Sequence, residues 1–337
     1  YSLVYAGSEN DPTLEDQLFE NLSIRRPDVY LGVECENLNE LTGQVMSKFE
    51  LYLQSHPTDV VIVVDDLAST MAAAIVTKKQ AITLAHIAAG TRSFDITMPK
   101  EINRLVIDGL SDILFTAGFS NNSIANKEGA ELSKVYMVGN ILIDNIRYNR
   151  ERVEGMRLND IDALAGLPLK EGSYIVFTLN RKALLADQEN LEKMLRVLCE
   201  TAGDLPIIAP LRDSAVQVIM ALGLKKNISL HNLHIVKPLN YLQFAYLTSH
   251  AQGIVTDSGN VAEEATFNNI PCITLNSYTE HIETVKVGSN VLVGEDAELL
   301  RSAFTDMVSG TWKKCGIPDR WDGRSAERIV QILLEHR

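Results

Sequence analysis

The sequence predicts an α/β protein made of two Rossmann-like domains, each built around a doubly wound parallel sheet. Short runs of β-branched residues alternate with amphipathic stretches of helical period, and this alternation occurs twice along the chain. The runs are apolar on both faces, which is typical of parallel strands covered by helices on both sides. With 337 residues, 46% of them hydrophobic, the chain is long enough to bury two cores.

The first series of elements begins at residue 60. Strands are expected at 60–64, 82–87, 113–116 and 135–138, and helices at 67–79, 101–110 and 141–153. Pro99 stands at the first turn of the second helix, a position that tolerates its missing N–H. Residues 2–5 also resemble a strand, but a doubly wound domain usually begins with a strand and a helix that lie centrally in the sheet. The usual first strand is therefore expected to be absent from these residues, either because the domain lacks it or because further residues precede Tyr1.

The second series follows a polar segment, 154–170, which is expected to be a linker. Strands are expected at 174–178, 206–209, 234–236, 254–256 and 272–275, and helices at 188–201, 214–222, 241–249 and 261–268. The predicted domains are 1–160 and 161–315, with a C-terminal helix in 316–337 that packs back across them. Two such domains imply a cleft, and ligands of doubly wound sheets bind beyond the carboxyl ends of the strands.

Composition excludes several classes of function. Acidic residues outnumber basic ones by 44 to 31, which argues against binding to nucleic acid or to an anionic membrane. No apolar run approaches the roughly 20 residues that span a bilayer, and no secretory signal is recognisable. The cysteines show no metal-binding spacing and are expected to be reduced thiols in a cytoplasmic protein: Cys35, Cys199, Cys272 and Cys315. Neither a metal nor a cofactor is indicated.

The stretch 253–265 is expected to hold an anion. It is predicted to be a buried strand, a small-residue turn and the first turns of a helix. The first N–H groups of a helix have no partner within it, so Ser258 and Gly259 are suited to a diphosphate. Glu263 and Glu264 lie one turn further, where a carboxylate either steadies the helix or reaches a ribose hydroxyl. The alternative is an ordinary turn capped by Asp257 or Ser258.

Titratable groups follow the strands of the first domain. Asp66 either acts in catalysis or caps the next helix. His86 is either a proton shuttle or a satisfied core residue. Glu101 and Arg104, three residues apart, are close enough to pair on a helix surface.

In the second domain, Arg181 follows a strand and offers a planar fork that suits phosphate. Glu280, His281 and Glu283 follow the strand after the anion-binding helix and are expected at the same edge. The chain has no Walker lysine loop, no complete GxGxxG and no HExxH.

Taken in order, these groups resemble the UDP-N-acetylglucosamine 2-epimerase family from about Pro57 to residues 322–326. The matching positions are Asp66; His86, Gly90 and Arg92; Pro99, Glu101, Asn103 and Arg104; Gly139, Asn140 and Asp144; Thr178 and Arg181; Pro210; Asp257, Ser258, Gly259, Glu263 and Glu264; Pro271; Thr279, Glu280 and Glu283; Val293 and Gly294.

The resemblance implies a glycosyltransferase-B-like pair of domains that close over a UDP-sugar, in a homodimer. It places the diphosphate at Ser258 and Gly259, the ribose at Glu264, the uracil near Phe244 and Arg181 toward the cleft. In such enzymes the C2 proton is removed and UDP is expelled to give a glycal, and UDP then adds back with C2 inverted.

The resemblance also implies a catalytic set of Asp66, Glu101 and Arg104, supported by His86, Glu280, His281 or Glu283. Several family positions are changed. The family usually has Glu at Ala88 and at Lys100, and His at Asn180, so most of its acid–base groups are missing here. Four hypotheses therefore stand: an epimerase acting on UDP-N-acetylglucosamine or a related 2-acetamido sugar, a non-catalytic UDP-sugar binder, a glycosyltransferase on the same fold, and a hydrolytic epimerase.

Overall fold

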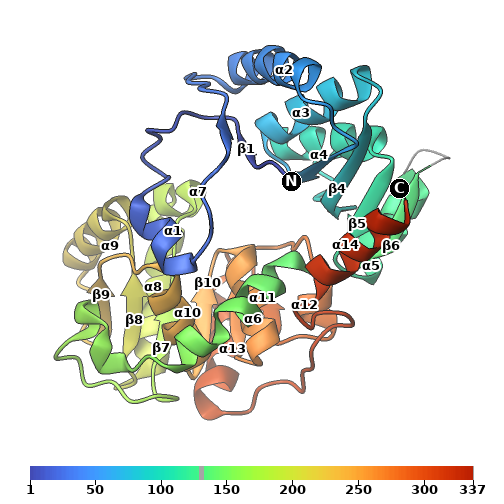
Figure 1. Cartoon of the computed structure of the whole chain (residues 1–337). Coiled ribbons are helices and arrows are strands. Elements are labelled where there is room, and N and C mark those ends of the chain that lie inside the picture. Colours follow the sequence, from blue (N-terminus) through green and yellow to red (C-terminus); the bar gives the residue numbers. More distant parts are fainter. Residues whose placement is uncertain (129–132, 337) are drawn as a thin grey trace. The chain divides into compact units, whose positions relative to one another are not determined.

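The computed structural model describes residues 1–128 and 133–336. The chain forms two compact units: unit 1 is Tyr1–Asp144 with Asp319–Arg337, and unit 2 is Asn145–Pro318 (Figure 1). The units divide within helix α6 (Ile141–Glu154), earlier than the expected boundary at residue 160. Residues 154–170 are not an open linker, because they carry two short 3-10 helices whose Ile161 and Leu164 are buried in a core cluster of unit 2.

Unit 1 contains a parallel sheet of four strands in the order β3 (Val60–Val64), β4 (Thr83–Ala89), β5 (Ile113–Thr116) and β6 (Lys134–Met137). The connecting helices are α3 (Ala68–Lys79), α4 (Pro99–Leu110) and α5 (Phe119–Glu128). The four strands and helices α3 and α4 confirm the predicted elements, and Pro99 is the first residue of α4. The register of β4 against β5 shifts between Ile87 and Ala89, which distorts the carboxyl end of β4.

The N-terminal part of unit 1 forms a second, smaller sheet. Strands β1 (Val4–Tyr5) and β2 (Val29–Tyr30) pair in parallel, with helix α1 (Asp16–Leu22) between them. Helix α2 (Leu38–Ser55) buries Phe49 and Leu53 against Val61 and Val63 of β3. The predicted alternation included neither of these helices.

Unit 2 contains six parallel strands in the order β12-β11-β10-β7-β8-β9. The strands are β7 (Ile175–Phe177), β8 (Ile207–Pro210), β9 (Leu233–Val236), β10 (Gly253–Thr256), β11 (Cys272–Thr274) and β12 (Asn290–Leu292). The helices are α7 (Lys182–Ala186), α8 (Gln188–Ala202), α9 (Asp213–Lys226), α10 (Tyr241–Ser249), α11 (Gly259–Asn268), α12 (Glu283–Lys286) and α13 (Ala297–Ser309). Chain order reverses between β7 and β10, so the carboxyl ends of these two strands mark the topological switch point.

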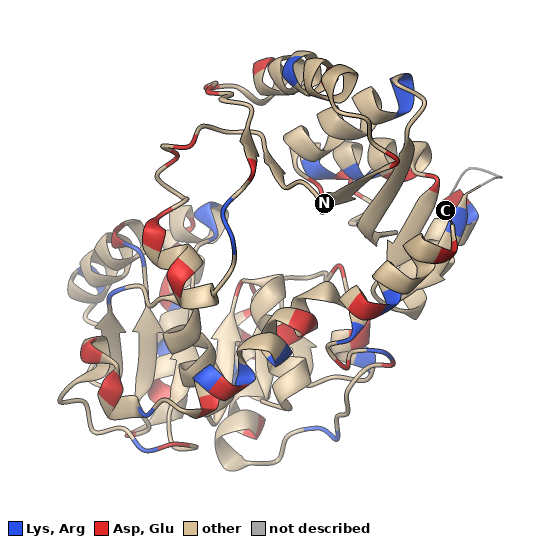
Figure 2. Ribbon diagram, in the orientation of Figure 1, with Lys and Arg blue, Asp and Glu red and all other residues tan. Residues whose placement is uncertain are grey.

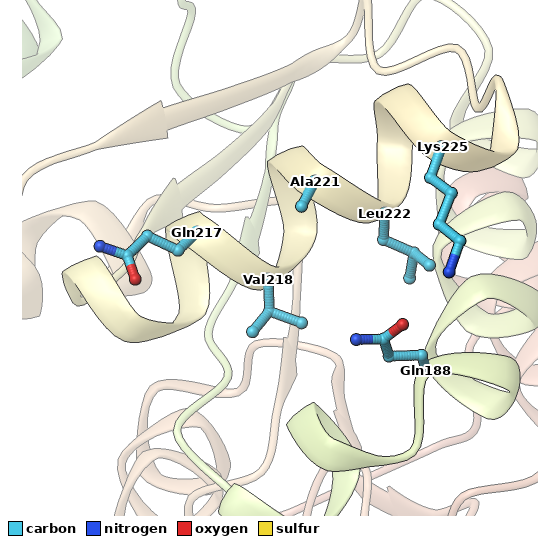
Figure 3. Close-up of a pocket in the computed structure, with 6 residues that line it drawn as sticks. All are labelled: Gln188, Gln217, Val218, Ala221, Leu222 and Lys225. Atoms are coloured by element: carbon cyan, nitrogen blue, oxygen red, sulfur yellow. The ribbon is translucent and has the colours of Figure 1, made fainter.

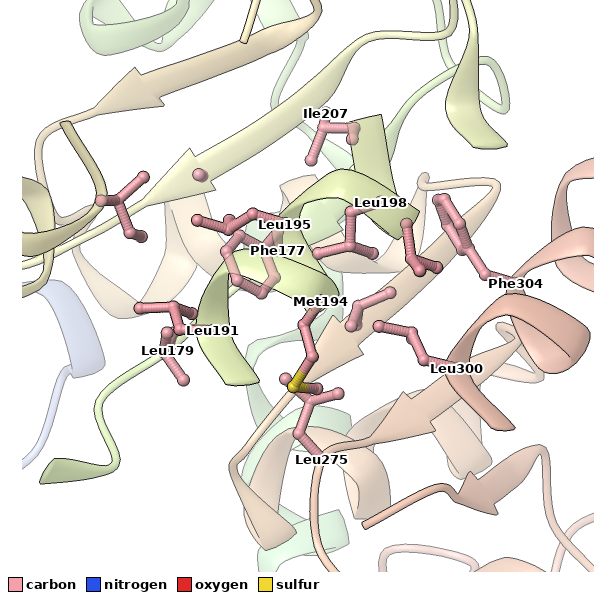
Figure 4. Close-up of a cluster of buried hydrophobic side chains, with 14 of the residues drawn as sticks. Phe177, Leu179, Leu191, Met194, Leu195, Leu198, Ile207, Leu275, Leu300 and Phe304 are labelled. Carbon is pink, nitrogen blue, oxygen red and sulfur yellow. The ribbon is translucent and has the colours of Figure 1, made fainter. Parts of the chain in front are cut away.

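Helices cover both faces of this sheet, as the apolar strands predict. On one face, α8 and α13 place Met194, Leu198 and Phe304 against Phe177 in a continuous core cluster (Figure 4). On the other face, side chains of α10 and α11 pack with Val176 and Ile254. The alternating strands and helices of each unit therefore confirm the predicted fold class of two Rossmann-like α/β domains.

The C-terminal segment returns to unit 1. Trp321 is buried and donates its indole N–H to the carbonyl of Ala117 at 3.1 Å. Helix α14 (Ser325–Glu335) packs Ile329 against a cluster that includes Phe115. The predicted terminal helix is thus present, and its described core contacts lie within unit 1.

Candidate functional site

In unit 2, the switch point brings together the loops that follow β7 and β10. The hydroxyls of Thr178 and Thr256 lie 2.7 Å apart, and the backbone N–H of Ser258 donates to the Thr256 hydroxyl at 3.0 Å. Ser258 is the N-cap of α11, and Ala262 N–H makes the first intrahelical bond, to Ser258 O at 3.3 Å. Helix geometry therefore leaves the N–H groups of residues 259–261 for a partner outside the helix.

Gly259 is exposed at this helix start, and its conformation does not need a glycine. A Cβ placed there would meet no heavy atom within 4 Å, and its φ is not positive. At Gly90, by contrast, φ is +72° and a Cβ would lie 2.1 Å from the carbonyl oxygen of Asn121. The fold thus requires glycine at position 90 and leaves free space above position 259, which fits a phosphate held by backbone N–H groups.

The side chains of Asp257 and Arg181 connect the loop after β7 to neighbouring loops of unit 2. Asp257 accepts the backbone N–H groups of Asn180 and Arg181 through one carboxylate oxygen, both at 2.6 Å. The guanidinium of Arg181 contacts Glu295 at 3.0 Å and also donates to Asn276. Arg181 is therefore at the predicted edge, and part of its planar fork is engaged with the loops that follow β11 and β12.

Glu264 lies in the second turn of α11 and is 8% exposed. Burial, reinforced by the charge of neighbouring Glu263, raises the pKa of Glu264 to about 7. Its side chain borders a cavity of about 210 Å³ between α6, α10 and α11, which Tyr241 also lines. Phe244, the residue expected near uracil, is partly buried and packs against the core cluster beneath α10.

The three supporting residues expected after β11 lie next to α11. The imidazole Nε2 of His281 is 3.6 Å from a carboxylate oxygen of Glu263, and both side chains are buried. Glu283 is buried at the first residue of α12, and Glu280 is half-buried in the loop before it. His281 is thus paired with a residue of α11.

A second hollow in unit 2, of about 310 Å³, lies between the first turn of α8 and one side of α9 (Figure 3). Its lining residues are Gln188, Gln217, Val218, Ala221, Leu222 and Lys225. These side chains include a single cation and no carboxylate, so the hollow offers no acid–base pair.

In unit 1, the three residues predicted to be catalytic form one buried cluster. Arg104 contacts one carboxylate oxygen of Asp66 through Nε at 2.9 Å and NH2 at 2.7 Å, and contacts Glu101 through NH1 at 3.3 Å. All three side chains are 4% exposed or less. The alternative of a surface pair between Glu101 and Arg104 is therefore wrong, because the face of α4 that carries them is packed inward.

The two carboxylates of this cluster differ. Glu101 accepts the backbone N–H and hydroxyl of Ser93 and the N–H of Phe94, all within 3.0 Å. Burial alone would raise the pKa of Glu101, but these donors and Arg104 outweigh it and hold the pKa below its usual range. Asp66 Oδ1 has no hydrogen-bond partner among the described residues, and the ammonium of Lys100 lies 3.4 Å from it. Glu101 is thus an anchor for a loop, whereas one buried oxygen of Asp66 accepts no hydrogen bond among the described residues.

His86 belongs to a separate buried network. Its Nδ1 lies 2.6 Å from Asp108 Oδ1, and its Nε2 lies 3.0 Å from the carbonyl oxygen of Asp65. Arg92 reaches the other oxygen of Asp108 at 2.8 Å. The sequence analysis did not assign Asp108, although residues 101, 104 and 108 of α4 follow a helical spacing that indicates one polar stripe.

Two of the three changed positions, Ala88 and Asn180, lie at or after strand ends, and Lys100 lies in the first turn of α4. Ala88 adopts a left-handed conformation, with φ +68°, in the irregular end of β4. Asn180 binds Asp257 through its backbone, and Lys100 is exposed beside Asp66. None of these side chains exchanges protons as a Glu or a neutral His would.

Within the described residues, no group of three His, Cys, Asp or Glu side chains could hold a metal ion. No described helix is long and apolar enough to cross a membrane. Acidic and basic side chains are interspersed along the ribbon of each unit, as Figure 2 shows.

Comparison with known proteins identifies the family. The sequence profile of UDP-N-acetylglucosamine 2-epimerase matches residues 1–334. The UDP-N-acetylglucosamine 2-epimerase of Methanocaldococcus jannaschii is 32% identical, over 99% of this chain and 91% of the relative. The UDP-2,3-diacetamido-2,3-dideoxy-D-glucuronate 2-epimerase of Pseudomonas aeruginosa is 31% identical, over 99% and 91%. A crystal structure of the Methanocaldococcus jannaschii enzyme with UDP-GlcNAc and UDP matches with a TM-score of 0.80, at 31% identity over 99% of this chain and 91% of that one. The chain therefore belongs to the UDP-N-acetylglucosamine 2-epimerase family.

Proposed function

We propose that this protein binds UDP-N-acetylglucosamine or a related UDP-2-acetamido sugar and inverts it at C2 by elimination and re-addition of UDP. The observation that carries the proposal is the open start of α11 at the switch point of unit 2, where Gly259 leaves backbone N–H groups uncovered. A family member that crystallises with UDP-GlcNAc and UDP supports UDP as the ligand.

The nucleotide half of the assignment rests on unit 2. Ser258 offers its hydroxyl and Gly259 its backbone N–H group to the diphosphate, and Arg181 adds positive charge at the same edge. Glu264, buried in the second turn of the same helix, holds a ribose hydroxyl. Phe244 is assigned to the uracil side of α10.

The chemical half rests on unit 1. A base takes the C2 proton, the C2–H electron pair forms the C1=C2 double bond of the glycal, and the C1–O bond breaks with its electrons leaving on the β-phosphate of UDP. Asp66 fits the base, because its Oδ1 lacks a hydrogen-bond donor while Arg104 fixes Oδ2. UDP then adds back to C1 while an acid other than Asp66 delivers a proton to the opposite face of C2, and Asp66 loses its proton to solvent, which completes the inversion.

A second candidate is a UDP-sugar binder without turnover. The observation that favours it is that Ala88, Lys100 and Asn180 stand where the family resemblance places titrating groups. A glycosyltransferase and a hydrolytic epimerase are further outcomes of the same test.

The test is to incubate UDP-N-acetylglucosamine with the wild-type protein in water and to identify the sugar products by NMR. An Asp66→Asn variant is measured in parallel. An epimerase gives the UDP-manno isomer and the variant loses it. Free N-acetylmannosamine with UDP would point to the hydrolytic enzyme, and UDP release only with an added acceptor to the transferase. Binding by calorimetry without any product would overturn the catalytic half and leave the binder.

We also propose a cytoplasmic homodimer. The dimer follows from the family resemblance, and the free state of all four cysteines supports a reducing compartment. Sedimentation equilibrium should give twice the chain mass of 37.3 kDa, and a species of 37.3 kDa at micromolar concentration would contradict the dimer.

A further inference from the structure

We propose that His86 is a buried imidazolium that positions Asp66, and that it is not a proton shuttle. The structural part stands on the geometry of unit 1 alone, whereas the catalytic consequence rests on the proposed function. His86 is 1% exposed and sits on β4, one strand away from the β3 end that carries Asp65 and Asp66.

Both ring nitrogens of His86 face hydrogen-bond acceptors. Nδ1 is 2.6 Å from a carboxylate oxygen of Asp108, and Nε2 is 3.0 Å from the carbonyl oxygen of Asp65. A backbone carbonyl cannot donate, so Nε2 carries a proton. An ionised Asp108 cannot donate either, so Nδ1 carries one too, and the ring is a cation.

The surroundings keep Asp108 ionised. Arg92 lies 2.8 Å from its second oxygen, and the N–H of Gly90 donates to that oxygen at 3.0 Å. Arg92 in turn pairs with Glu128 of α5 at 2.9 Å. The two positive charges, on His86 and Arg92, are thus paired with two negative charges, on Asp108 and Glu128. This pairing offsets the cost of removing the His86 cation from water.

The imidazolium reaches the candidate base through the backbone. Asp65 has φ +67°, a left-handed conformation that is unfavourable for a residue with a side chain. Its carbonyl is held by His86, and its N–H donates to Ile87 O at 3.2 Å. The carbonyl of Asp66 is held in the same way by the side-chain amide of Asn103, at 2.8 Å. His86 and Asn103 therefore brace the turn from two sides and aim the Asp66 side chain.

The first experiment is nitrogen NMR of the histidine rings in the wild-type protein at neutral pH. The His86 ring, assigned by loss of its signals in a His86→Gln variant, should show two protonated nitrogens. A ring with one unprotonated nitrogen would overturn the imidazolium. This readout does not depend on turnover, so it stands even if the proposed epimerase activity fails.

The second experiment separates the two hydrogen bonds. In His86→Gln the amide nitrogen takes the place of Nε2 and can still reach the Asp65 carbonyl, whereas in His86→Asn it takes the place of Nδ1 and reaches only Asp108. We expect kcat to fall about tenfold or more in His86→Asn and to be partly restored in His86→Gln, with KM and UDP affinity unchanged in both.

Equal kcat in His86→Asn and wild type would overturn the positioning role. A crystal structure of His86→Asn adds a readout without turnover: Asp65 should leave its positive φ, and an unchanged turn would contradict the proposal.

Discussion

The ion pair of Asp66 with Arg104 is buried, and this has a measurable consequence for stability. Replacing Asp66 by Asn keeps its size and removes the charge that compensates the guanidinium, which is 3% exposed. We expect a loss of about 3 kcal/mol in the free energy of unfolding, measured by urea denaturation. The control is Glu189→Gln, which breaks an exposed pair with Lys193 on α8 and should cost less than about 0.5 kcal/mol. Equal effects of the two changes would contradict the buried pair.

Glu264 should make stability depend on pH. Its pKa is about 7 in the folded chain and 4.5 as a free side chain, so between these values the folded state keeps a proton that the unfolded state has lost. Stability therefore falls as pH rises from about 4.5 to about 7, and the effect is constant above that range. The shift corresponds to about 3 kcal/mol at most.

Glu264→Gln cannot ionise, so it should gain stability relative to wild type as pH rises, by up to that amount between pH 5 and pH 8. Urea denaturation at both pH values measures the difference. If the difference in unfolding free energy between Glu264→Gln and wild type is the same at pH 5 and pH 8, the raised pKa of Glu264 is contradicted.

At the residue scale, the sequence identifies the candidate site residues more readily than it identifies the role of each. Asp66 could be chosen because it follows a strand, and Glu101 and Arg104 because they lie in the first turns of a helix that begins at Pro99; the structure places the three in contact. Spacing alone cannot tell a buried helix face from an exposed one, so the loop contacts of Glu101 were not visible, whereas a buried core position was one of the two alternatives for His86. Asp108 was readable from its position on the same stripe of α4 and was missed.

At the scale of the element, a substitution at the start of α11 should change the affinity for UDP without changing the stability of the fold. Gly259→Ala meets no atom of the protein, so the free energy of unfolding should change by less than about 1 kcal/mol. The added methyl group occupies the space assigned to a phosphate, so UDP should bind at least about tenfold more weakly, as calorimetry would show. Gly43→Ala, at another open site in α2, is the control: it should stabilise the fold by about 1 kcal/mol and leave UDP affinity unchanged. Unchanged UDP affinity in Gly259→Ala would contradict the assignment of the start of α11 as the phosphate site.

A charge at the same helix start provides an independent test. Ser258→Asp places a carboxylate at the N-cap, which suits the helix but repels a diphosphate. We expect stability to be retained and the Kd for UDP to rise about tenfold or more, the larger effect appearing at low salt. Ser302→Asp adds the same charge on an exposed position of α13 and should leave the Kd unchanged. If both variants bind UDP equally well, Ser258 is not at the phosphate site.

The elements that the sequence predicted are those with strong periodicity. Strands β3 to β5 and β7 to β11 are short runs of mainly apolar residues between helical stretches, so their type and order could be predicted. Helix α2 was not identified, although Val45, Phe49 and Leu53 recur at helical spacing on its buried face. The strand expected at 2–5 is present as β1, whereas its two-residue partner β2 carries no periodic signal and is defined only by tertiary pairing.

At the scale of the whole molecule, the chain passes between the units within α6 and again after Pro318. The predicted division at residue 160 relied on the polar composition of 154–170. Burial of Ile161 and Leu164 assigns that stretch to unit 2, since a few apolar side chains are enough to dock an otherwise polar segment. The return of Trp321 and α14 to unit 1 rests on contacts between residues about 200 positions apart, which a local pattern cannot contain.

The central claim is that this protein both binds a UDP-sugar and exchanges the proton at C2 of that sugar. The most direct measurement is deuterium incorporation at C2 of UDP-N-acetylglucosamine, followed by NMR in deuterated water with wild-type protein. The account predicts deuterium at C2 in both the gluco and the manno isomer, and none with Asp66→Asn. Saturating binding of the UDP-sugar without deuterium at C2 would contradict it.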